Sequence, residues 1–246
     1  VIGATVVAFG TSLPELAVSV GSNMKALAEG GGYNPDGPAA IAIGNIVGSN
    51  IFNIGAILGL SAIVKTLPFP SEIKKRDLPI MFGALVMLVI FSVWGAPYQI
   101  SRWEAGFLFA GLIAFTVFAI QSGKVDTEDV PEVDSHESML KTIGFIGLGI
   151  SMLMIGGDVS LNGAISLSHW FGLSERVIGL TVMSIGTSLP ELATSIQAVR
   201  RGHSEMAVAN VVGSNIFNVL CIVGVAGLII PLPVPQAMVQ WDFFWM

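Results

Sequence analysis

The sequence GTSLPELA occupies residues 10–17 and recurs without change at residues 186–193. Each copy lies within a strongly apolar stretch, and each contains one carboxylate, Glu15 in the first copy and Glu191 in the second. A carboxylate inside a membrane-spanning segment is costly unless it contacts a cation, water or a polar partner. The two glutamates are therefore the first candidates for an ion-binding site.

The composition indicates a membrane protein with several spans. Of the 246 residues, 53% are hydrophobic and only 11% are charged, which is outside the usual range of soluble domains. Uncharged runs at 41–64 and 78–101 are long enough to cross a hydrocarbon core of about 30 Å as helices. We therefore expect an all-α polytopic membrane protein whose surroundings are the lipid bilayer. No nucleic acid and no protein partner is indicated.

The chain also contains an internal repeat. Residues 1–20 match residues 177–196 at 14 of 20 positions, and NIVGSNIFN at 45–53 matches NVVGSNIFN at 210–218 at 8 of 9. The apolar runs predict spans at about 1–27, 40–64, 78–97, 103–122, 139–169, 174–200 and 205–230, with an eighth beginning near Asp242.

The two copies are predicted to have opposite orientations in the membrane. Five spans lie between the start of the first copy and the start of the second, and an odd number of crossings reverses the direction of entry. Two inverted-topology repeats with broken helices at the midplane are typical of secondary transporters. We divide the chain into a first repeat with its following helices (1–123), an acidic loop (124–138) and a second repeat (139–246). Lys and Arg are more numerous on the face that carries the acidic loop, which predicts that this loop is cytoplasmic.

The GTSLPEL motif combines a helix break with a group of oxygen atoms. Pro14 has no N–H to donate to the carbonyl of Gly10, so the helix is predicted to break there. Thr11 and Ser12 precede Glu15 by four and three residues, which places their hydroxyls on the face of the carboxylate. The equivalent residues of the second copy are Gly186, Thr187, Ser188, Pro190 and Glu191.

The second motif adds a polar stripe to an otherwise apolar helix. Asn45, Ser49 and Asn53 recur every four residues, as do Asn210, Ser214 and Asn218 in the second copy. Together with the two carboxylates they form an all-oxygen set, which suits hard cations such as Ca²⁺, Mg²⁺, Na⁺ or K⁺ and does not suit zinc or copper. A second interpretation is that these side chains only hydrogen-bond neighbouring helices. Asn50 and Asn215 lie off the stripe and are predicted to be packing or capping groups.

With GTSLPEL and GSNIFN each present twice in inverted halves, the chain resembles the alpha repeats of the calcium/cation antiporter superfamily, in particular its sodium/calcium exchanger branch. The resemblance implies a protein of the plasma (inner) membrane that exchanges Na⁺ for Ca²⁺ by alternating access, with no cofactor and no enzymatic activity. It also implies metal-ion ligands at Thr11, Ser12, Glu15, Ser49 and Asn53 in the first repeat and at Thr187, Ser188, Glu191, Ser214 and Asn218 in the second.

The chain departs from this resemblance in two respects. Many members of the branch have aspartate where Asn218 stands, whereas this chain has asparagine in both repeats. The superfamily commonly has ten spans, so we expect the first helix and nearly all of the last two to be missing from this chain.

Three other functions remain open from the residues alone. A Ca²⁺/H⁺ exchanger would use the same two glutamates to trade the cation for protons. An intramembrane hydrolase would use them as an acid and a base acting on water. A passive cation channel could also contain two internal repeats.

Overall fold

The computed structural model describes residues 8–31, 34–35, 37–94, 98–122 and 170–246, together with scattered positions between 141 and 169. Within this part of the chain, four helices are long and apolar enough to cross a membrane: Pro38–Val64, Ile73–Trp94, Arg102–Gln121 and Ser204–Ile229. A further span consists of two helices, Arg176–Thr187 and Leu189–Arg200, which meet at a bend of 41°. The protein is an all-helical, multi-pass membrane protein, as its composition predicts.

Most of the predicted spans that fall on described residues are confirmed closely. The spans predicted at 40–64, 103–122, 174–200 and 205–230 agree with the helices within two residues. The helix predicted to begin at residue 78 begins five residues earlier. The basic residues before it form a π-helical turn, η2 (Ile73–Asp77), which leads directly into α5 (Leu78–Trp94). The acidic loop and most of the span predicted at 139–169 lie outside the described residues.

Both GTSLPEL motifs break their helices at the same residue. Residues 8–11 are helical, Ser12 is a turn with φ −86° and ψ 7°, and α2 (Leu13–Ala28) follows. In the second copy α9 (Ser184–Thr187) ends at Ser188, with φ −87° and ψ 7°, and α10 (Leu189–Arg200) begins. The proline stands in the first turn of the new helix, where its missing N–H has no intrahelical role. The predicted breaks at the prolines are therefore present in both repeats.

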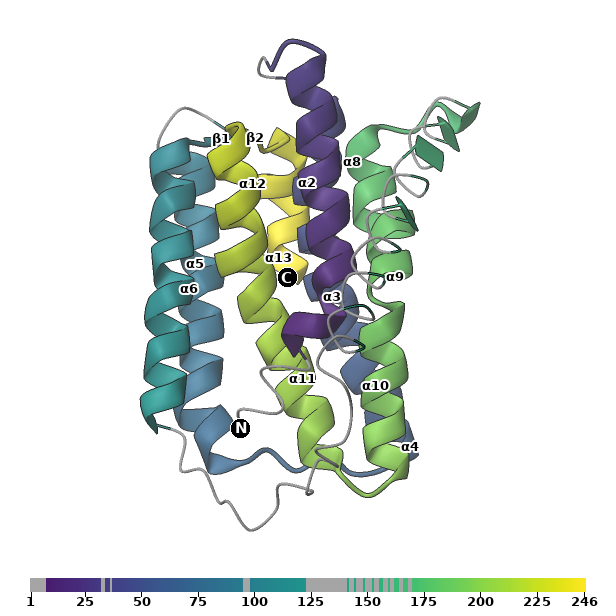
Figure 1. Cartoon of the computed structure of the whole chain (residues 1–246), viewed down its shortest axis with the longest axis vertical. Coiled ribbons are helices and arrows are strands. Elements are labelled where there is room, and N and C mark those ends of the chain that lie inside the picture. Colours follow the sequence, from purple (N-terminus) through teal and green to yellow (C-terminus); the bar gives the residue numbers. More distant parts are fainter. Residues whose placement is uncertain are drawn as a thin grey trace.

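The two copies run in opposite directions (Figure 1). From the middle of the molecule α2 runs to one end, whereas α10 runs to the other end. The chain returns from α2 through α3 (Pro38–Phe52), and from α10 through α11 (Ser204–Phe217). The beginnings of α2 and α10 therefore lie together near the centre, and each helix leads to a different face of the membrane.

A π-helical turn follows the second motif in both repeats. α3 continues as η1 (Asn53–Leu58) and α4 (Gly59–Val64), and α11 continues as η5 (Asn218–Val223) and α12 (Gly224–Ile229). Each π turn starts at the last asparagine of the polar stripe. Single π turns within α-helices occur frequently at functional sites, because they change the direction of the side chains that follow.

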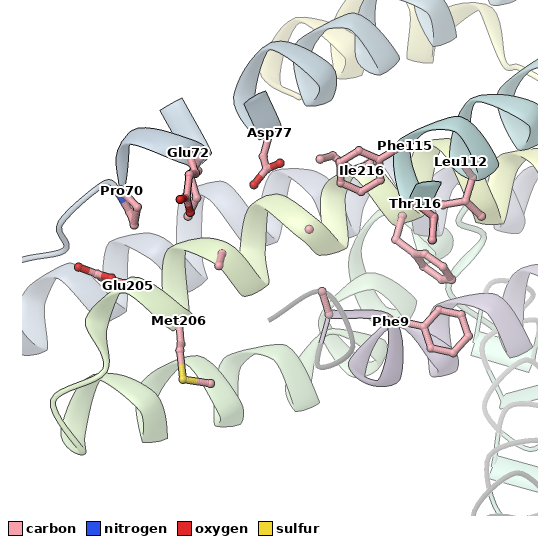
Figure 2. A pocket seen from close by; sticks show the side chains of 15 residues that line it. Phe9, Pro70, Glu72, Asp77, Leu112, Phe115, Thr116, Glu205, Met206 and Ile216 are labelled. Atoms are coloured by element: carbon pink, nitrogen blue, oxygen red, sulfur yellow. The ribbon is translucent and has the colours of Figure 1, made fainter. Parts of the chain in front are cut away.

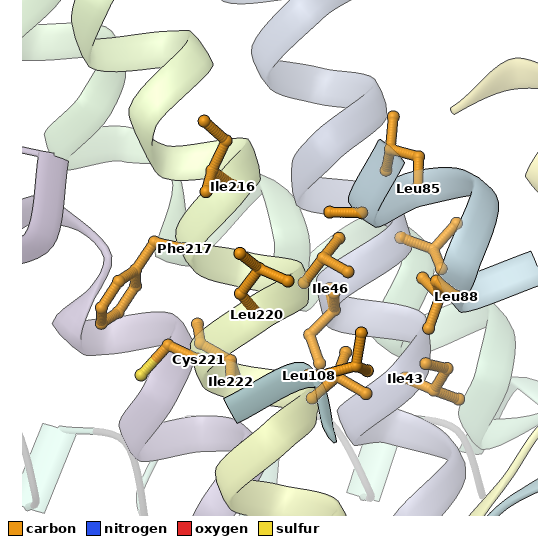
Figure 3. Close-up of a cluster of buried hydrophobic side chains, with 14 of the residues drawn as sticks. Ile43, Ile46, Leu85, Leu88, Leu108, Ile216, Phe217, Leu220, Cys221 and Ile222 are labelled. Carbon is orange, nitrogen blue, oxygen red and sulfur yellow. The ribbon is translucent and has the colours of Figure 1, made fainter. Parts of the chain in front are cut away.

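The apolar core lies between the second-motif helices and two flanking helices, α5 and α6 (Arg102–Ser122). Figure 3 shows Ile43, Ile46 and Leu88 packed with Leu108 and Leu220 in this core. The five tryptophans are instead strongly exposed, most of them near helix ends: Trp94, Trp103, Trp170, Trp241 and Trp245. Exposed indoles near the ends of apolar helices are typical of tryptophans that lie at the membrane interface.

Close helix packing joins the first repeat to the second. α3 packs against α8 (Glu175–Ile178), η4 (Gly179–Met183) and α9. A Cβ at Gly44 would lie 2.8 Å from the carbonyl oxygen of Arg176, and one at Gly48 would overlap the carbonyl of Leu180. Only glycine permits this approach of the two backbones.

A short strand pair in the described region was not predicted. β1 (Gln99–Ile100) pairs antiparallel with β2 (Leu232–Pro233), and the Val234 amide donates to the Tyr98 carbonyl at 2.7 Å. The pair joins the loop before α6 to the loop after α12. Two-residue strands are too short to produce a detectable alternation of polar and apolar residues in the sequence.

Candidate cation site

Glu15 and Glu191 are both completely buried, in the first turns of α2 and α10. The two helices run away from each other, so the carboxylates approach the centre of the molecule from opposite halves. The N-terminal end of a helix carries a partial positive charge, which favours a carboxylate at this position.

Crossed hydrogen bonds connect the two repeats at this point. Ser12 Oγ donates to Oε1 of Glu191 at 2.9 Å, and Ser188 Oγ donates to Oε1 of Glu15 at 2.9 Å. The sequence predicted that each serine would accompany the glutamate of its own helix. The helix break turns each hydroxyl toward the glutamate of the other repeat, and the two carboxylates thereby meet in one site.

The two threonines make equivalent contacts to the second motifs. Thr11 Oγ1 donates to Oδ1 of Asn210 at 3.4 Å, and Thr187 Oγ1 donates to Oδ1 of Asn45 at 3.1 Å. Each hydroxyl also lies near the carbonyl three residues before it, at 3.2 Å for Thr11 and 3.5 Å for Thr187. The first residues of both polar stripes therefore belong to the same network as the helix breaks.

The remaining polar residues of the stripes are buried in the same region. Asn53 Nδ2 donates to Oδ1 of Asn215 at 2.9 Å, and Asn218 Nδ2 donates to Oδ1 of Asn50 at 3.0 Å. Ser49 and Ser214 are also fully buried. α2 packs against α3 and η5, while α10 packs against α11 and η1, so both repeats contribute to each side of the site.

Several buried oxygens of this region have no hydrogen-bond partner among the residues that the structure describes. They form three equivalent pairs: Oε2 of Glu15 and Glu191, Oγ of Ser49 and Ser214, and Oδ1 of Asn53 and Asn218. Buried polar atoms normally have a partner, and each exception requires an explanation. Carboxylate, hydroxyl and amide oxygens are the ligands of hard cations, so this set fits such an ion.

No group of three or more His, Cys, Asp or Glu side chains that could hold a metal ion occurs among the described residues. Soft transition metals prefer thiolate and imidazole ligands, whereas this site consists of oxygen atoms.

One contact of the site was missed by the sequence analysis. Ser184 Oγ lies 3.0 Å from the carbonyl of Asn45 and 2.7 Å from that of Gly179, so it joins α9 to α3. The first repeat has Ala8 at the equivalent position, and comparison of the two repeats therefore gave no signal for it.

A cavity of about 510 Å³ lies beside the site, between α6, α11 and the turn before α5 (Figure 2). Glu72, Asp77 and Glu205 lie toward one end of this cavity, and Phe9 and Phe115 lie toward the other. None of the ten predicted ligands lines the cavity. It is therefore distinct from the candidate cation site.

Inverted helical repeats that meet at a buried pair of carboxylates define a secondary transporter of cations. The model of the family described as sodium/calcium exchanger protein matches residues 1–121 and 141–246, and the chain belongs to this family. The protein is accordingly a membrane antiporter for cations including Ca²⁺, and it is not an enzyme.

Curated relatives and a solved structure agree with this assignment. The chain is 34% identical over 240 residues to the inner membrane protein YrbG of Escherichia coli, covering 94% of this chain and 70% of the relative. It is 30% identical over 273 residues to the sodium/calcium exchanger MaX1 of Methanosarcina acetivorans, covering 96% and 75%. A structure of the sodium-calcium exchanger NCX_Mj, soaked with Na⁺ and Sr²⁺, matches with a TM-score of 0.67 and 29% identity, covering 99% of this chain and 75% of that one.

Proposed function

We propose that the protein exchanges Na⁺ for Ca²⁺ by alternating access, with both ions using the site between the two repeats. The proposed ligands are the side chains of Thr11, Ser12, Glu15, Ser49, Asn53, Thr187, Ser188, Glu191, Ser214 and Asn218. The observation that carries this proposal is the set of six buried oxygens, three from each repeat, whose partners a cation would supply.

The charge of the site supports competition between the two ions. Glu15 and Glu191 supply two negative charges, and both proposed asparagine ligands are neutral. One Ca²⁺ balances the two carboxylates and occupies oxygen ligands that Na⁺ ions would also need, so the two kinds of ion compete for one set of oxygens. Binding of Ca²⁺ and of several Na⁺ ions is therefore mutually exclusive, and this exclusion couples their transport.

The inverted arrangement supports alternating access. α2 leads from the site to one face and α10 leads to the other, so an ion released along either repeat leaves on a different side of the membrane. Because the two repeats make equivalent contacts at the site, the movement that opens the site to one face has an equivalent movement that opens it to the other face.

We further propose that the chain consists of three parts: a first repeat at 1–123, a cytoplasmic acidic loop at 124–138 and a second repeat at 139–246. The excess of Lys and Arg on the face of that loop supports this orientation. A location in the plasma (inner) membrane is supported by the similarity to a relative that is named an inner membrane protein.

The coupling ion is tested by uptake of Ca²⁺ into liposomes that contain the purified protein. Vesicles loaded with Na⁺ are expected to accumulate Ca²⁺ from a Na⁺-free medium, and uptake should saturate with Ca²⁺ concentration. If more than two Na⁺ ions leave for each Ca²⁺, an inside-positive potential should accelerate uptake, because each cycle moves positive charge outward.

A matched set of vesicles carries a pH gradient in place of the Na⁺ gradient. Uptake driven by protons and indifferent to Na⁺ would contradict the proposal and identify a Ca²⁺/H⁺ exchanger. Uptake that needs neither gradient and does not saturate would indicate a channel.

A further inference from the structure

Two amide pairs cross between the repeats next to the proposed ligands. Asn53 donates its Nδ2 to Asn215 Oδ1, and Asn218 donates its Nδ2 to Asn50 Oδ1, at 2.9 Å and 3.0 Å. All four side chains are at most 1% exposed. Neither Asn50 nor Asn215 belongs to the proposed ligand set, and the sequence predicted only a packing or capping role for them.

The orientation of a carboxamide decides whether it can bind a cation. Its oxygen attracts a positive ion, whereas its NH₂ group repels one, and the two ends are similar in size. In both pairs the NH₂ group of the ligand residue is directed to the partner in the other repeat. The Oδ1 atoms of Asn53 and Asn218 are then left without a partner among the described residues, as a cation ligand requires.

We infer that Asn50 and Asn215 are positioning residues, which hold the carboxamides of Asn218 and Asn53 with their oxygens toward the transported ion. This inference rests on the proposed function, because it concerns two of the proposed ligands. Neither positioning residue touches the ion in this account. Each acts by accepting one hydrogen bond.

The hydrogen bonds in the two pairs favour a role in orienting the ligand carboxamides over a role in helix–helix packing alone. In the described part of the structure, Asn215 Nδ2 has no partner, and Asn50 Nδ2 contacts only a sulfur, Met246 Sδ at 3.7 Å. Side chains that served only to join α3 to α11 would be expected to use their own NH₂ groups as well. In these pairs, the strong hydrogen bond is the one that turns the ligand residue.

An aspartate in place of the ligand asparagine removes the need for orientation. A carboxylate has oxygen at both ends, so no rotation of Asp at position 218 can present an N–H group to the cation. The dependence on Asn50 should therefore disappear in the Asn218→Asp background. A purely structural role of Asn50 would persist in that background.

The experiment is a double-mutant cycle on Ca²⁺ affinity, measured by isothermal titration calorimetry on the purified protein. Asn50→Leu is expected to weaken Ca²⁺ binding at least about tenfold in the native background. Without its acceptor, the carboxamide of Asn218 can rotate and turn its NH₂ group toward the cation. In the Asn218→Asp background the same change should weaken binding less than about threefold. In the matched Asn53→Asp background, where the partner of Asn50 is still asparagine, the tenfold loss should remain.

Two further variants keep the test decisive. Asn50→Ala replaces Asn50→Leu in the cycle if the leucine variant does not fold, and Asn50→Asp, which retains the acceptor, should keep at least the native affinity. An equal loss in all three backgrounds would overturn the positioning role and leave the proposed function intact. If Asn218→Ala and Asn53→Ala both leave Ca²⁺ affinity unchanged, these residues are not ligands, and the ligand assignment fails together with this inference.

Discussion

Replacing Glu15 with glutamine is expected to abolish measurable Ca²⁺ binding. The variant leaves one carboxylate, that of Glu191, against a divalent ion in a buried site, and one positive charge is then uncompensated. Removing one partner of a buried charge pair costs about 3–5 kcal/mol, which corresponds to a loss of at least about 100-fold in affinity. Calorimetric titration of Ca²⁺ into the purified variant measures this loss directly.

The equivalence of the two repeats provides the comparison variants. Glu191→Gln should have the same effect as Glu15→Gln, because the two residues occupy equivalent positions with crossed serine partners. Glu205→Gln changes an exposed glutamate in the first turn of α11 and should leave Ca²⁺ affinity within about twofold of the native value. Near-normal affinity in both buried-site variants would refute the assignment of the site.

Gly48→Ala is expected to destabilise the protein strongly. The added methyl group would overlap the backbone carbonyl of Leu180 and the hydroxyl of Ser184, and a backbone carbonyl inside a helix cannot move aside without disturbing that helix. Overpacking of this kind costs about 3 kcal/mol, which lowers the midpoint of thermal unfolding by roughly 6–12 °C in a chain of this size. The measurement is a thermal melt in detergent.

Gly59→Ala is the matched control for this prediction. Gly59 opens α4 on the continuation of the same span, and no described atom outside its own helix lies within 4 Å of its added Cβ. Because alanine favours the helix more than glycine does, this variant should be as stable as the native protein or slightly more stable. Equal stability of the two variants would mean that α3 and η4 are not in close contact.

Much of the architecture could be predicted from the sequence because one motif occurs twice. The prolines of the identical GTSLPEL copies predicted one helix break in each repeat, and the number of apolar runs between the copies predicted their opposite orientation. The buried glutamates were detectable for a physical reason, since a carboxylate is conspicuous in an apolar segment. The prediction of an oxygen-rich region around Glu15 and Glu191 followed from the same pattern.

The connections between the repeats could not be predicted in this way. Helical spacing relates residues within one helix, so it placed Ser12 beside Glu15, whereas the hydroxyl donates to Glu191 in the other repeat. The hydrogen bonds of Asn50 and Asn215 could not be predicted for the same reason, because their partners are on helices far away in the sequence. The π turns that begin at Asn53 and Asn218 depend on tertiary packing, which a periodic pattern does not describe.

The central claim is that Glu15 and Glu191 form one cation site at the junction of the two repeats. Anomalous X-ray diffraction from crystals of the protein soaked with Sr²⁺, a scatterer that substitutes for Ca²⁺, tests this claim most directly. We predict a single strong anomalous peak between the two carboxylates, within bonding distance of both. A peak that contacts only one of the glutamates, or two separate peaks at the two helix breaks, would contradict the account.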